Sequence, residues 1–261
     1  MRILILGGTR EARDLARLTS GERGFDIVSS LAGRVRDPVL PAGQVRVGGF
    51  GGVDGLVNWL AANDVAAVVD ATHPFAATMS THAAVAAAAR GIPLLRLLRP
   101  AWTQRAGDSW TRVPDLEGAA RVLPALGARV FLTIGRQGVG AFADLDRQWF
   151  LIRSIEPPDP PLPSHHELLL ARGPFSVDAE LLVMSRHRVD VLVTKDSGGE
   201  ATEAKIVAAR IAGVPVLVVD RPAPPPGVTA VASTAEAMRW LRAQRDSRPG
   251  SRSNQARTAR S

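Results

Sequence analysis

Residues 2–18 read RILILGGTREARDLARL, and this stretch decides the fold of the N-terminal part of the chain. Four apolar residues run into Gly7, Gly8 and Thr9, and further apolar residues follow at helical spacing within a charged run. The pattern predicts a strand, a tight turn and a helix. Two glycines let the backbone approach a ligand closely, and the free N–H groups at a helix start favour a phosphate. The stretch therefore predicts a nucleotide-binding site.

The glycine spacing departs from the dinucleotide fingerprint G-x-G-x-x-G, because residues 7–12 read GGTREA. Ala12 stands where the third glycine of the fingerprint packs the helix against the strand. A glycine turn that only joins a strand to a helix is the alternative interpretation.

The composition is that of a globular protein. The chain has 261 residues, of which 46% are hydrophobic, and no apolar run is long enough to span a membrane. Met1 leads directly into the predicted first strand without a signal-peptide pattern, and the lack of cysteine excludes disulfides and thiolate metal sites. We expect a cytoplasmic protein with no membrane partner and no bound metal.

The net charge of +7 is concentrated near the C-terminus. Residues 242–261 contain six Arg and one Asp, a sum of +5, which leaves +2 for the rest of the chain. The Arg/Ser-rich end has no apolar periodicity, so residues 245–261 are predicted to be a disordered, solvated tail. Nucleic-acid binding through this tail is an alternative interpretation, and we expect no nucleic-acid partner.

The end of the second predicted strand, Phe25 to Ser29, indicates which dinucleotide binds. A Rossmann unit that binds NAD places a carboxylate about 20 residues after the glycines to hold the adenine ribose. This sequence has Ser29 and Ser30 there, followed by Arg34. Hydroxyls and a guanidinium suit a 2′-phosphate, so the pattern favours NADP(H) over NAD(H), and an exposed Arg-rich loop is the alternative.

Two further loops are predicted to face the same ligand. Residues 48–52 read GGFGG between a strand at 45–47 and a helix at 54–62, which leaves backbone around Phe50 free to approach a flat molecule. An apolar strand at 66–69 ends in DATHPF before an Ala-rich helix at 76–90. Ligands collect at the carboxyl ends of parallel strands, which favours a site at Thr72 and His73. Alternatively, either residue caps the helix whose first turn carries Pro74, and both roles are compatible.

Strands and helices alternate again beyond a strand at 93–98 and a predicted hinge at residues 99–110, which indicates an α/β class with two domains. The second set has helices at 115–125, 177–187, 201–212 and 234–243 and strands at 129–133, 149–155, 190–194 and 214–219. We assign residues 1–110 to the nucleotide-binding domain and residues 111–244 to a second domain.

Lysine is confined to this second domain. Lys195 and Lys205 are the only lysines, against 30 arginines, and Lys195 begins the glycine loop KDSGG after an apolar strand. A compact ammonium suits contact with a carboxylate or transfer of a proton, whereas chance is the competing explanation.

Eight short motifs, in this order and at these spacings, resemble those of the precorrin-6A reductases of cobalamin biosynthesis. They are ILILGGTREAR, SSLAGR, VRVGGFGG, DATHPFA, RPAW, LTIGRQG, RGPF and TKDSGGEATEAKI, and the likeness covers nearly all of residues 1–243. The resemblance implies an enzyme that uses NADPH to reduce one double bond of the precorrin-6A macrocycle, giving precorrin-6B. It implies two Rossmann-like three-layer α/β domains with mainly parallel sheets, an active-site cleft between them, and neither metal nor flavin. Reduction of cobalt-precorrin-6A in the anaerobic route and a non-catalytic NADPH-sensing protein stay as alternatives.

The residues and the resemblance together give a set of expected roles. The residues expected to bind the cofactor are Gly7, Gly8, Thr9, Glu11, Ala12, Ser29, Ser30, Arg34, Gly49, Phe50, Gly51, Thr72 and His73. The residues expected to bind the polycarboxylate substrate are Arg136, Gln137, Arg172, Lys195, Ser197, Gly198 and Gly199, with Arg153 as a further cation.

Lys195 and His73 are the candidate catalytic residues. The cofactor carries the hydride chemistry, so the protein mainly positions two flat molecules and supplies one proton at most. Lys195 is expected to pair with a substrate carboxylate or to donate this proton, and the alternative is a surface ion pair with Asp196 or Glu200. A monomer is favoured.

Overall fold

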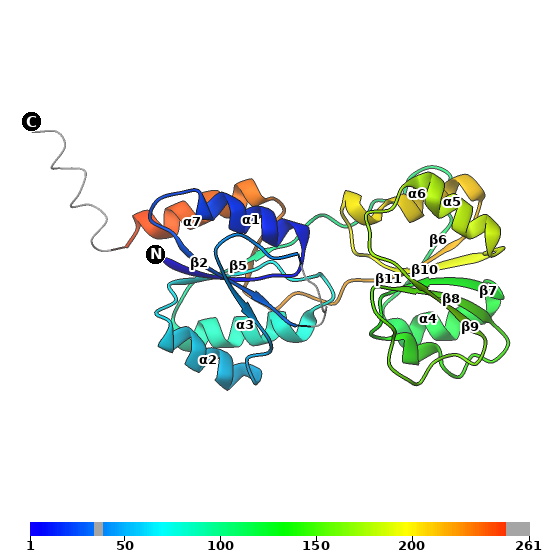
Figure 1. Ribbon diagram of the computed structural model, residues 1–261, viewed down its shortest axis with the longest axis horizontal. Helices are drawn as coiled ribbons and strands as arrows, with labels where there is room; N and C mark the ends of the chain where they lie inside the picture. The colour runs from blue at the N-terminus through cyan, green and yellow to red at the C-terminus, as the bar shows by residue number, and fades with distance from the viewer. Residues whose placement is uncertain (34–38, 249–261) are drawn as a thin grey trace, which may run out of the picture. The chain divides into compact units, whose positions relative to one another are not determined.

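The computed structural model describes residues 1–33 and 39–248. It divides into two compact units, which are Met1–Arg99 together with the chain from Ala223 onward, and Pro100–Pro222 (Figure 1). Each unit contains one six-stranded sheet whose neighbouring strands all pair in parallel, with helices on both faces. These layers confirm the predicted α/β class with two Rossmann-like domains.

The first sheet has the strand order β12-β5-β4-β1-β2-β3. Its strands are β1 (Arg2–Leu6), β2 (Asp26–Leu31), β3 (Gln44–Val47), β4 (Ala67–Asp70), β5 (Leu94–Leu97) and β12 (Thr229–Val231). The direction of the order reverses between β1 and β4. In open parallel sheets a ligand binds beyond the carboxyl ends of the strands at such a reversal, which is where the glycine turn after β1 lies.

The helices of the first unit form two layers. Helices α1 (Arg10–Ser20) and α7 (Thr234–Asp246) cover one face of the sheet, and α2 (Gly52–Ala62) and α3 (Ala77–Arg90) cover the other (Figure 1). Successive residues of a strand point to opposite faces, so Ile3 packs with the α1 and α7 layer, whereas Leu4 packs with Leu56 and Ala83 of the other layer. Strand β1 thus contributes apolar side chains to the cores on both faces of the sheet.

Strand β12 and helix α7 belong to the first unit, so the predicted division at residue 110 is wrong for these elements. β12 pairs with β5, and α7 buries Ala237, Met238 and Leu241 in the core beside α1. The chain passes from the first unit to the second after Arg99 and returns at Ala223. Alternation along the sequence does not say which of two sheets a final helix covers, so the predicted helix at 234–243 was assigned to the nearer, second domain, and β12 was not predicted.

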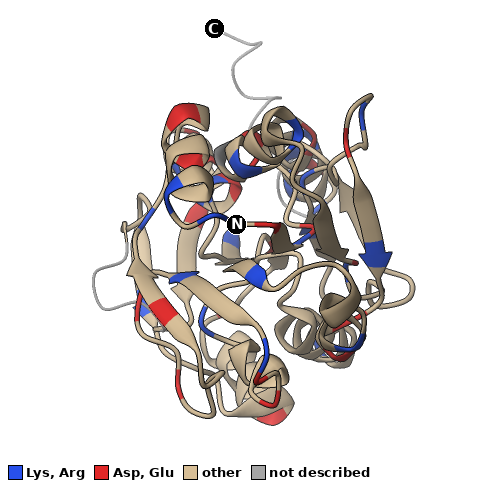
Figure 2. Cartoon of the chain, turned by 90° about the vertical axis from the view of Figure 1, so that its right-hand side faces the viewer, with Lys and Arg blue, Asp and Glu red and all other residues tan. Residues whose placement is uncertain are grey.

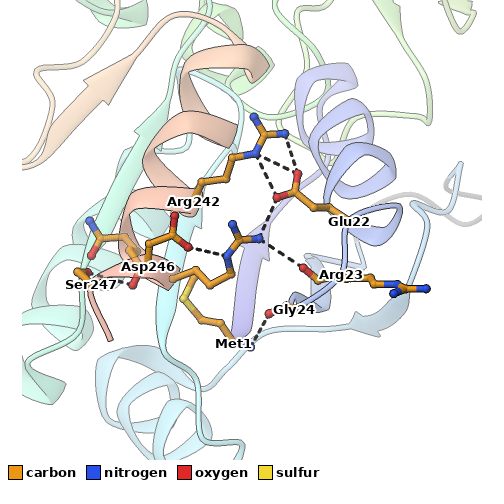
Figure 3. A network of polar contacts seen from close by, with 9 residues as sticks. Met1, Glu22, Arg23, Gly24, Arg242, Asp246 and Ser247 are labelled. Carbon is orange, nitrogen blue, oxygen red and sulfur yellow. Dashed lines mark hydrogen bonds and ion pairs between the residues drawn. The ribbon is translucent and has the colours of Figure 1, made fainter. Parts of the chain in front are cut away.

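Charged side chains join the last turn of α7 to the segment after α1 (Figure 3). The Glu22 carboxylate accepts hydrogen bonds from Arg242 at 2.7 Å and Arg245 at 2.9 Å, and the bonds from Arg242 are the main cause of its lowered pKa. The Arg245 guanidinium also lies 5.0 Å from the centre of the Phe25 ring. Residues 245 and 246 are therefore part of a helix, in contrast to the predicted tail, while residues 249–261 lie outside the described residues.

Truncation after Gln244 is expected to lower the melting temperature by about 2–4 °C relative to truncation after Arg248. Only the shorter chain loses Arg245, which is one of two guanidinium partners of Glu22 and lies against Phe25. Scanning fluorimetry of the two truncated proteins measures the difference. A carboxyl pKa lowered in the folded state stabilises the fold above its unfolded pKa, so the difference should shrink as pH falls through the lowered pKa of Glu22. Equal melting temperatures at neutral pH would contradict a stabilising role of Arg245.

The second sheet has the strand order β6-β11-β10-β7-β8-β9. Its strands are β6 (Trp110–Val113), β7 (Arg129–Thr133), β8 (Trp149–Ser154), β9 (His166–Leu170), β10 (Val191–Lys195) and β11 (Val216–Val219). The helices are α4 (Leu116–Val122), α5 (Val177–Arg186) and α6 (Ala204–Ala212), with short 3₁₀ turns η1 (Leu123–Ala125), η2 (Val139–Phe142) and η3 (Glu200–Thr202). Helices α5 and α6 pack on one face and α4 on the other (Figure 1). The order reverses between β7 and β10, so a second ligand-binding edge is expected where these two strands end.

Candidate functional site

The turn between β1 and α1 is fixed by one threonine. The Thr9 hydroxyl caps α1 by accepting a hydrogen bond from the Ala12 N–H at 3.1 Å, and it donates to the Ala71 carbonyl oxygen, beyond β4, at 2.8 Å. Gly8 has a φ of 111°, a conformation that a residue with a side chain adopts at a cost. Ala12 is buried against the strand, as expected for the third position of the fingerprint. The turn therefore presents the amino end of α1 at the reversal of the strand order, where backbone N–H groups attract a phosphate.

Glu11, which was expected to bind the cofactor, forms an ion pair with Arg99. The Arg99 Nη1 atom lies 3.1 Å from the Glu11 carboxylate, and both side chains are mostly covered. A lone carboxylate in the first turn of α1 would repel a phosphate, and the guanidinium offsets its charge. The structure thus gives Glu11 a partner at the carboxyl end of β5.

Ser29 and Ser30 both lie within β2, which extends to Leu31. They are 1% and 6% exposed and, as neighbours in a strand, point to opposite faces of the sheet. The Ser30 hydroxyl accepts a hydrogen bond from Arg46 at 3.4 Å, whereas the Ser29 hydroxyl is buried without a hydrogen-bond partner among the described residues. Arg34 lies outside the described residues, so its predicted contact with a 2′-phosphate stays a prediction.

The GGFGG loop is packed against Arg46, the third residue of β3. The guanidinium lies 3.8 Å from the centre of the Phe50 ring and donates to the carbonyl oxygens of Gly48 at 2.5 Å and Gly49 at 2.6 Å. The Phe50 ring also meets Trp59 edge to face. One face of Phe50 is therefore covered by a cation. Gly51, with a φ of 80°, leads the loop into α2.

Thr72 and His73 follow β4 at the same edge of the sheet as the turn after β1. The N–H and the hydroxyl of Thr72 both donate to the Asp70 carboxylate, which lies 3.9 Å from Arg96. His73 is exposed, and its Nδ1 atom accepts a hydrogen bond from the Phe75 N–H at 3.2 Å. The N-cap of α3 is Ala76, so the alternative that Thr72 or His73 caps this helix is wrong.

The arginines expected to meet the substrate differ in what they contact. Arg136, which follows β7, forms an ion pair with Glu156 at 2.9 Å, and both Gln137 and Arg172 are exposed. Arg153 is buried and was wrongly grouped with them. Its guanidinium lies 2.7 Å from the Glu180 carboxylate and stacks between two phenylalanine rings.

Lys195 is the last residue of β10, at the reversal of the second sheet. Its side chain is largely covered, and burial lowers the pKa of its ammonium because a charge is less stable away from water. Gly198 and Gly199, with φ values of 63° and 76°, turn the chain behind it. The Ser197 N–H donates to the Lys195 carbonyl oxygen at 2.7 Å, which tightens the start of this loop.

The loop after Lys195 is held by contacts that the sequence interpretation did not predict. The buried Asp196 carboxylate accepts hydrogen bonds from the Trp102 N–H at 3.2 Å and from Arg112 at 2.8 Å. The Trp102 indole N–H donates to the Gly199 carbonyl oxygen at 3.3 Å. Asp196 is buried and anchors the loop, so it does not fit the alternative interpretation of an ion pair with Lys195 at the surface.

The described residues contain neither a group of three or more His, Asp or Glu side chains able to hold a metal ion nor a helix with the length and apolar character needed to cross a membrane. Basic and acidic segments are interspersed along the described chain in the view of Figure 2. The candidate sites of both units are thus built from glycine turns, hydroxyl groups and a few cationic side chains at the ends of strands.

Comparisons with known proteins agree on one family. The profile of the family "Precorrin-6x reductase CbiJ/CobK" matches residues 2–242. The chain belongs to this family. It is 58% identical over 240 residues to a precorrin-6A reductase of Rhodococcus erythropolis and 48% identical over 241 residues to one of Mycobacterium tuberculosis, with 92% of this chain and 97% of each relative covered. A solved structure of the CobK precorrin-6A reductase matches with a TM-score of 0.87 at 43% identity, covering 94% of this chain and 97% of that one. Matching cobalt-precorrin-6A reductases are 28–29% identical.

Within this CbiJ/CobK chain, the structure brings those expected cofactor residues that it describes, which excludes Arg34, to one edge of the first sheet. The turn after β1, the end of β2, the GGFGG loop and the end of β4 are linked there by the Thr9 and Arg46 hydrogen bonds. The expected substrate residues follow β7 and β9, end β10 at Lys195, or lie in the loop after it. Arg46 and Arg112 were missed because each looks like one more arginine in an Arg-rich sequence, and only their contacts distinguish them.

Proposed function

We propose that this protein uses NADPH to reduce one double bond of precorrin-6A, giving precorrin-6B in cobalamin biosynthesis. Membership of a reductase family supports the reaction class. The observation that supports a dinucleotide as the cofactor is the position of the Thr9-capped start of α1, beside the reversal of the first sheet. Bound there, NADPH would supply the hydride.

The residues present fit such a cofactor. The amino end of α1 suits a pyrophosphate, and Gly8, at φ 111°, leaves open space where a Cβ would stand. The edge formed by β2 and β3 carries Ser30 and a guanidinium in place of the carboxylate that favours NAD. Thr72 and His73, which follow β4, are proposed to contact the part of the dinucleotide that crosses the reversal.

The second unit is proposed to bind the macrocycle. Arg136, Arg172 and Lys195 lie at or beyond strand ends and offer cations to its carboxylates. Reduction of a carbon–carbon double bond adds a hydride and a proton, and the partly buried Lys195 ammonium is our candidate donor of the proton. The cleft between the domains, a cytoplasmic location and a monomeric state stay predictions.

Incubation of the purified protein with NADPH and precorrin-6A tests the proposal. The expected result is loss of NADPH absorbance together with a macrocycle that has gained two hydrogen atoms by mass spectrometry. Parallel incubation with cobalt-precorrin-6A tests the anaerobic alternative, which the lower identity to its named enzymes disfavours. Binding of NADPH without its consumption in the presence of either macrocycle would support the sensing protein instead.

A further inference from the structure

We infer that Arg46 binds the 2′-phosphate of the dinucleotide and thereby sets the preference for NADPH over NADH. The inference rests on the proposed function, and it assigns to a residue of β3 a role that the sequence favoured for Arg34. Three features of Arg46 carry it: its position, its charge and its unused hydrogen-bond donors.

The position is that of an adenosine-binding residue. Arg46 pairs in register with Ser30, so its side chain rises near the carboxyl ends of β2 and β3, on the face where Ser30 also points. In a Rossmann unit the ribose next to the adenine lies at the end of the second strand, where an arginine accommodates the 2′-phosphate. The Ser30 hydroxyl, 3.4 Å from the guanidinium, adds a second polar group for such a ligand.

The charge of Arg46 is not balanced by a carboxylate among the described residues. The two other arginines in the described strands of the first sheet each face one, Arg2 at 3.5 Å from Asp26 and Arg96 at 3.9 Å from Asp70. Arg46 contacts two carbonyl oxygens, a hydroxyl and the rings of Phe50 and Trp59 instead, which are all uncharged. Partial burial without a neighbouring anion also lowers its pKa. A phosphate would supply the missing negative charge.

The guanidinium has donors to spare and is held in place. Of its five N–H donors, the described contacts use two on Nη1 and one on Nη2, which leaves the Nε–H and one Nη2–H for a ligand. These two donors can bind two phosphate oxygens side by side. The Phe50 ring and the Gly48 and Gly49 carbonyl groups fix the plane of the guanidinium, so little side-chain freedom is lost on binding.

Calorimetric binding of NADPH, NADH, 2′,5′-ADP and 5′-AMP to the wild type and to Arg46→Gln tests the inference. We expect Arg46→Gln to bind NADPH and 2′,5′-ADP about ten- to a hundredfold more weakly, because a charge-assisted contact is lost. NADH and 5′-AMP should bind nearly as before. An equal loss for all four ligands would make Arg46 a support of the loop only, and an unchanged preference for NADPH would also overturn the inference.

Arg2→Gln is the matched control, because it removes a strand guanidinium at the opposite, amino-terminal edge of the same sheet. It should leave all four affinities unchanged. Arg46→Lys keeps a cation without the paired donors and should show an intermediate loss for NADPH, which keeps the test decisive where Arg46→Gln fails to fold. Failure of the wild type to bind NADPH would refute the proposed function itself. Binding by the wild type with no change of preference in either Arg46 variant would refute this inference alone.

Discussion

Replacing Lys195 by Met is expected to lower turnover at saturating precorrin-6A by about 10²–10⁴-fold, the usual contribution of a positioned proton donor. Lys195 ends β10 at the reversal of the second sheet, and burial lowers the pKa of its ammonium below the ordinary lysine value. A lowered pKa brings a lysine closer to the range in which it gives up a proton readily. Steady-state kinetics with both substrates varied measures the loss.

Two observations separate a proton donor from a carboxylate anchor. Lys195→Arg keeps the positive charge but holds its proton, so an anchor should tolerate this change and a donor should not. An increase in the Michaelis constant for precorrin-6A at unchanged turnover would identify Lys195 as an anchor. Unchanged kinetics in Lys195→Met would leave it without either role.

The pH dependence gives a further check on Lys195. Wild-type turnover should fall as pH rises through the lowered pKa of the lysine, and this fall should be missing from the residual activity of Lys195→Met. The stability of the fold should change with pH in the opposite direction to turnover. A lysine pKa that is lower in the folded than in the unfolded state makes the fold less stable at pH values below both, so Lys195→Met is not expected to lower the melting temperature at neutral pH.

Glu180→Ala is expected to lower the free energy of unfolding by about 3–5 kcal/mol, because it leaves one charge of a buried pair alone. The Glu180 and Arg153 side chains are 1% and 7% exposed and lie 2.7 Å apart. Without Glu180, the Arg153 guanidinium would remain charged between the Phe131 and Phe175 rings. Urea unfolding followed by tryptophan fluorescence measures the change.

The matched control for this pair is the double variant Arg153→Met, Glu180→Met. Removing both charges and keeping the volume is often neutral or stabilising, so the double variant should regain most of the loss. A single variant that loses less than about 1 kcal/mol would show that water reaches Arg153 and that the pair is not isolated.

The sequence predicted most elements of the sheets, and the missed ones share physical causes. The strand at 129–133 has the predicted bounds, because a wholly apolar core is flanked by clear turns. β9 at 166–170 is mostly exposed and β12 has three residues, so neither shows the burial pattern on which the prediction relied. β6 begins at Trp110, the last residue of the supposed hinge, and Trp102 of the same hinge is packed into the core of the second unit.

The candidate site was predictable where it depends on local spacing. The glycine turn and its capped helix follow from neighbouring residues, and the structure has both. The partner of Glu11 lies 88 residues away, and the anchors of Asp196 come from the segment that opens the second unit, so no local pattern indicates them. Arg46 is distinguished by having no carboxylate partner among the described residues, which only the packed structure shows. The roles of these residues in binding and catalysis stay predictions.

The return of β12 and α7 to the first sheet has a consequence during synthesis on the ribosome. The second unit is one continuous segment, Pro100–Pro222, whereas the first unit is completed only by residues that emerge after it. Until then β5 is an open edge strand, and the α1 layer lacks Met238 and Leu241. We therefore expect the later-encoded domain to finish folding before the N-terminal one, the reverse of the usual order for nascent chains. A stalled nascent chain ending near Pro222 should contain a protease-resistant second unit and a first unit that is still cleaved.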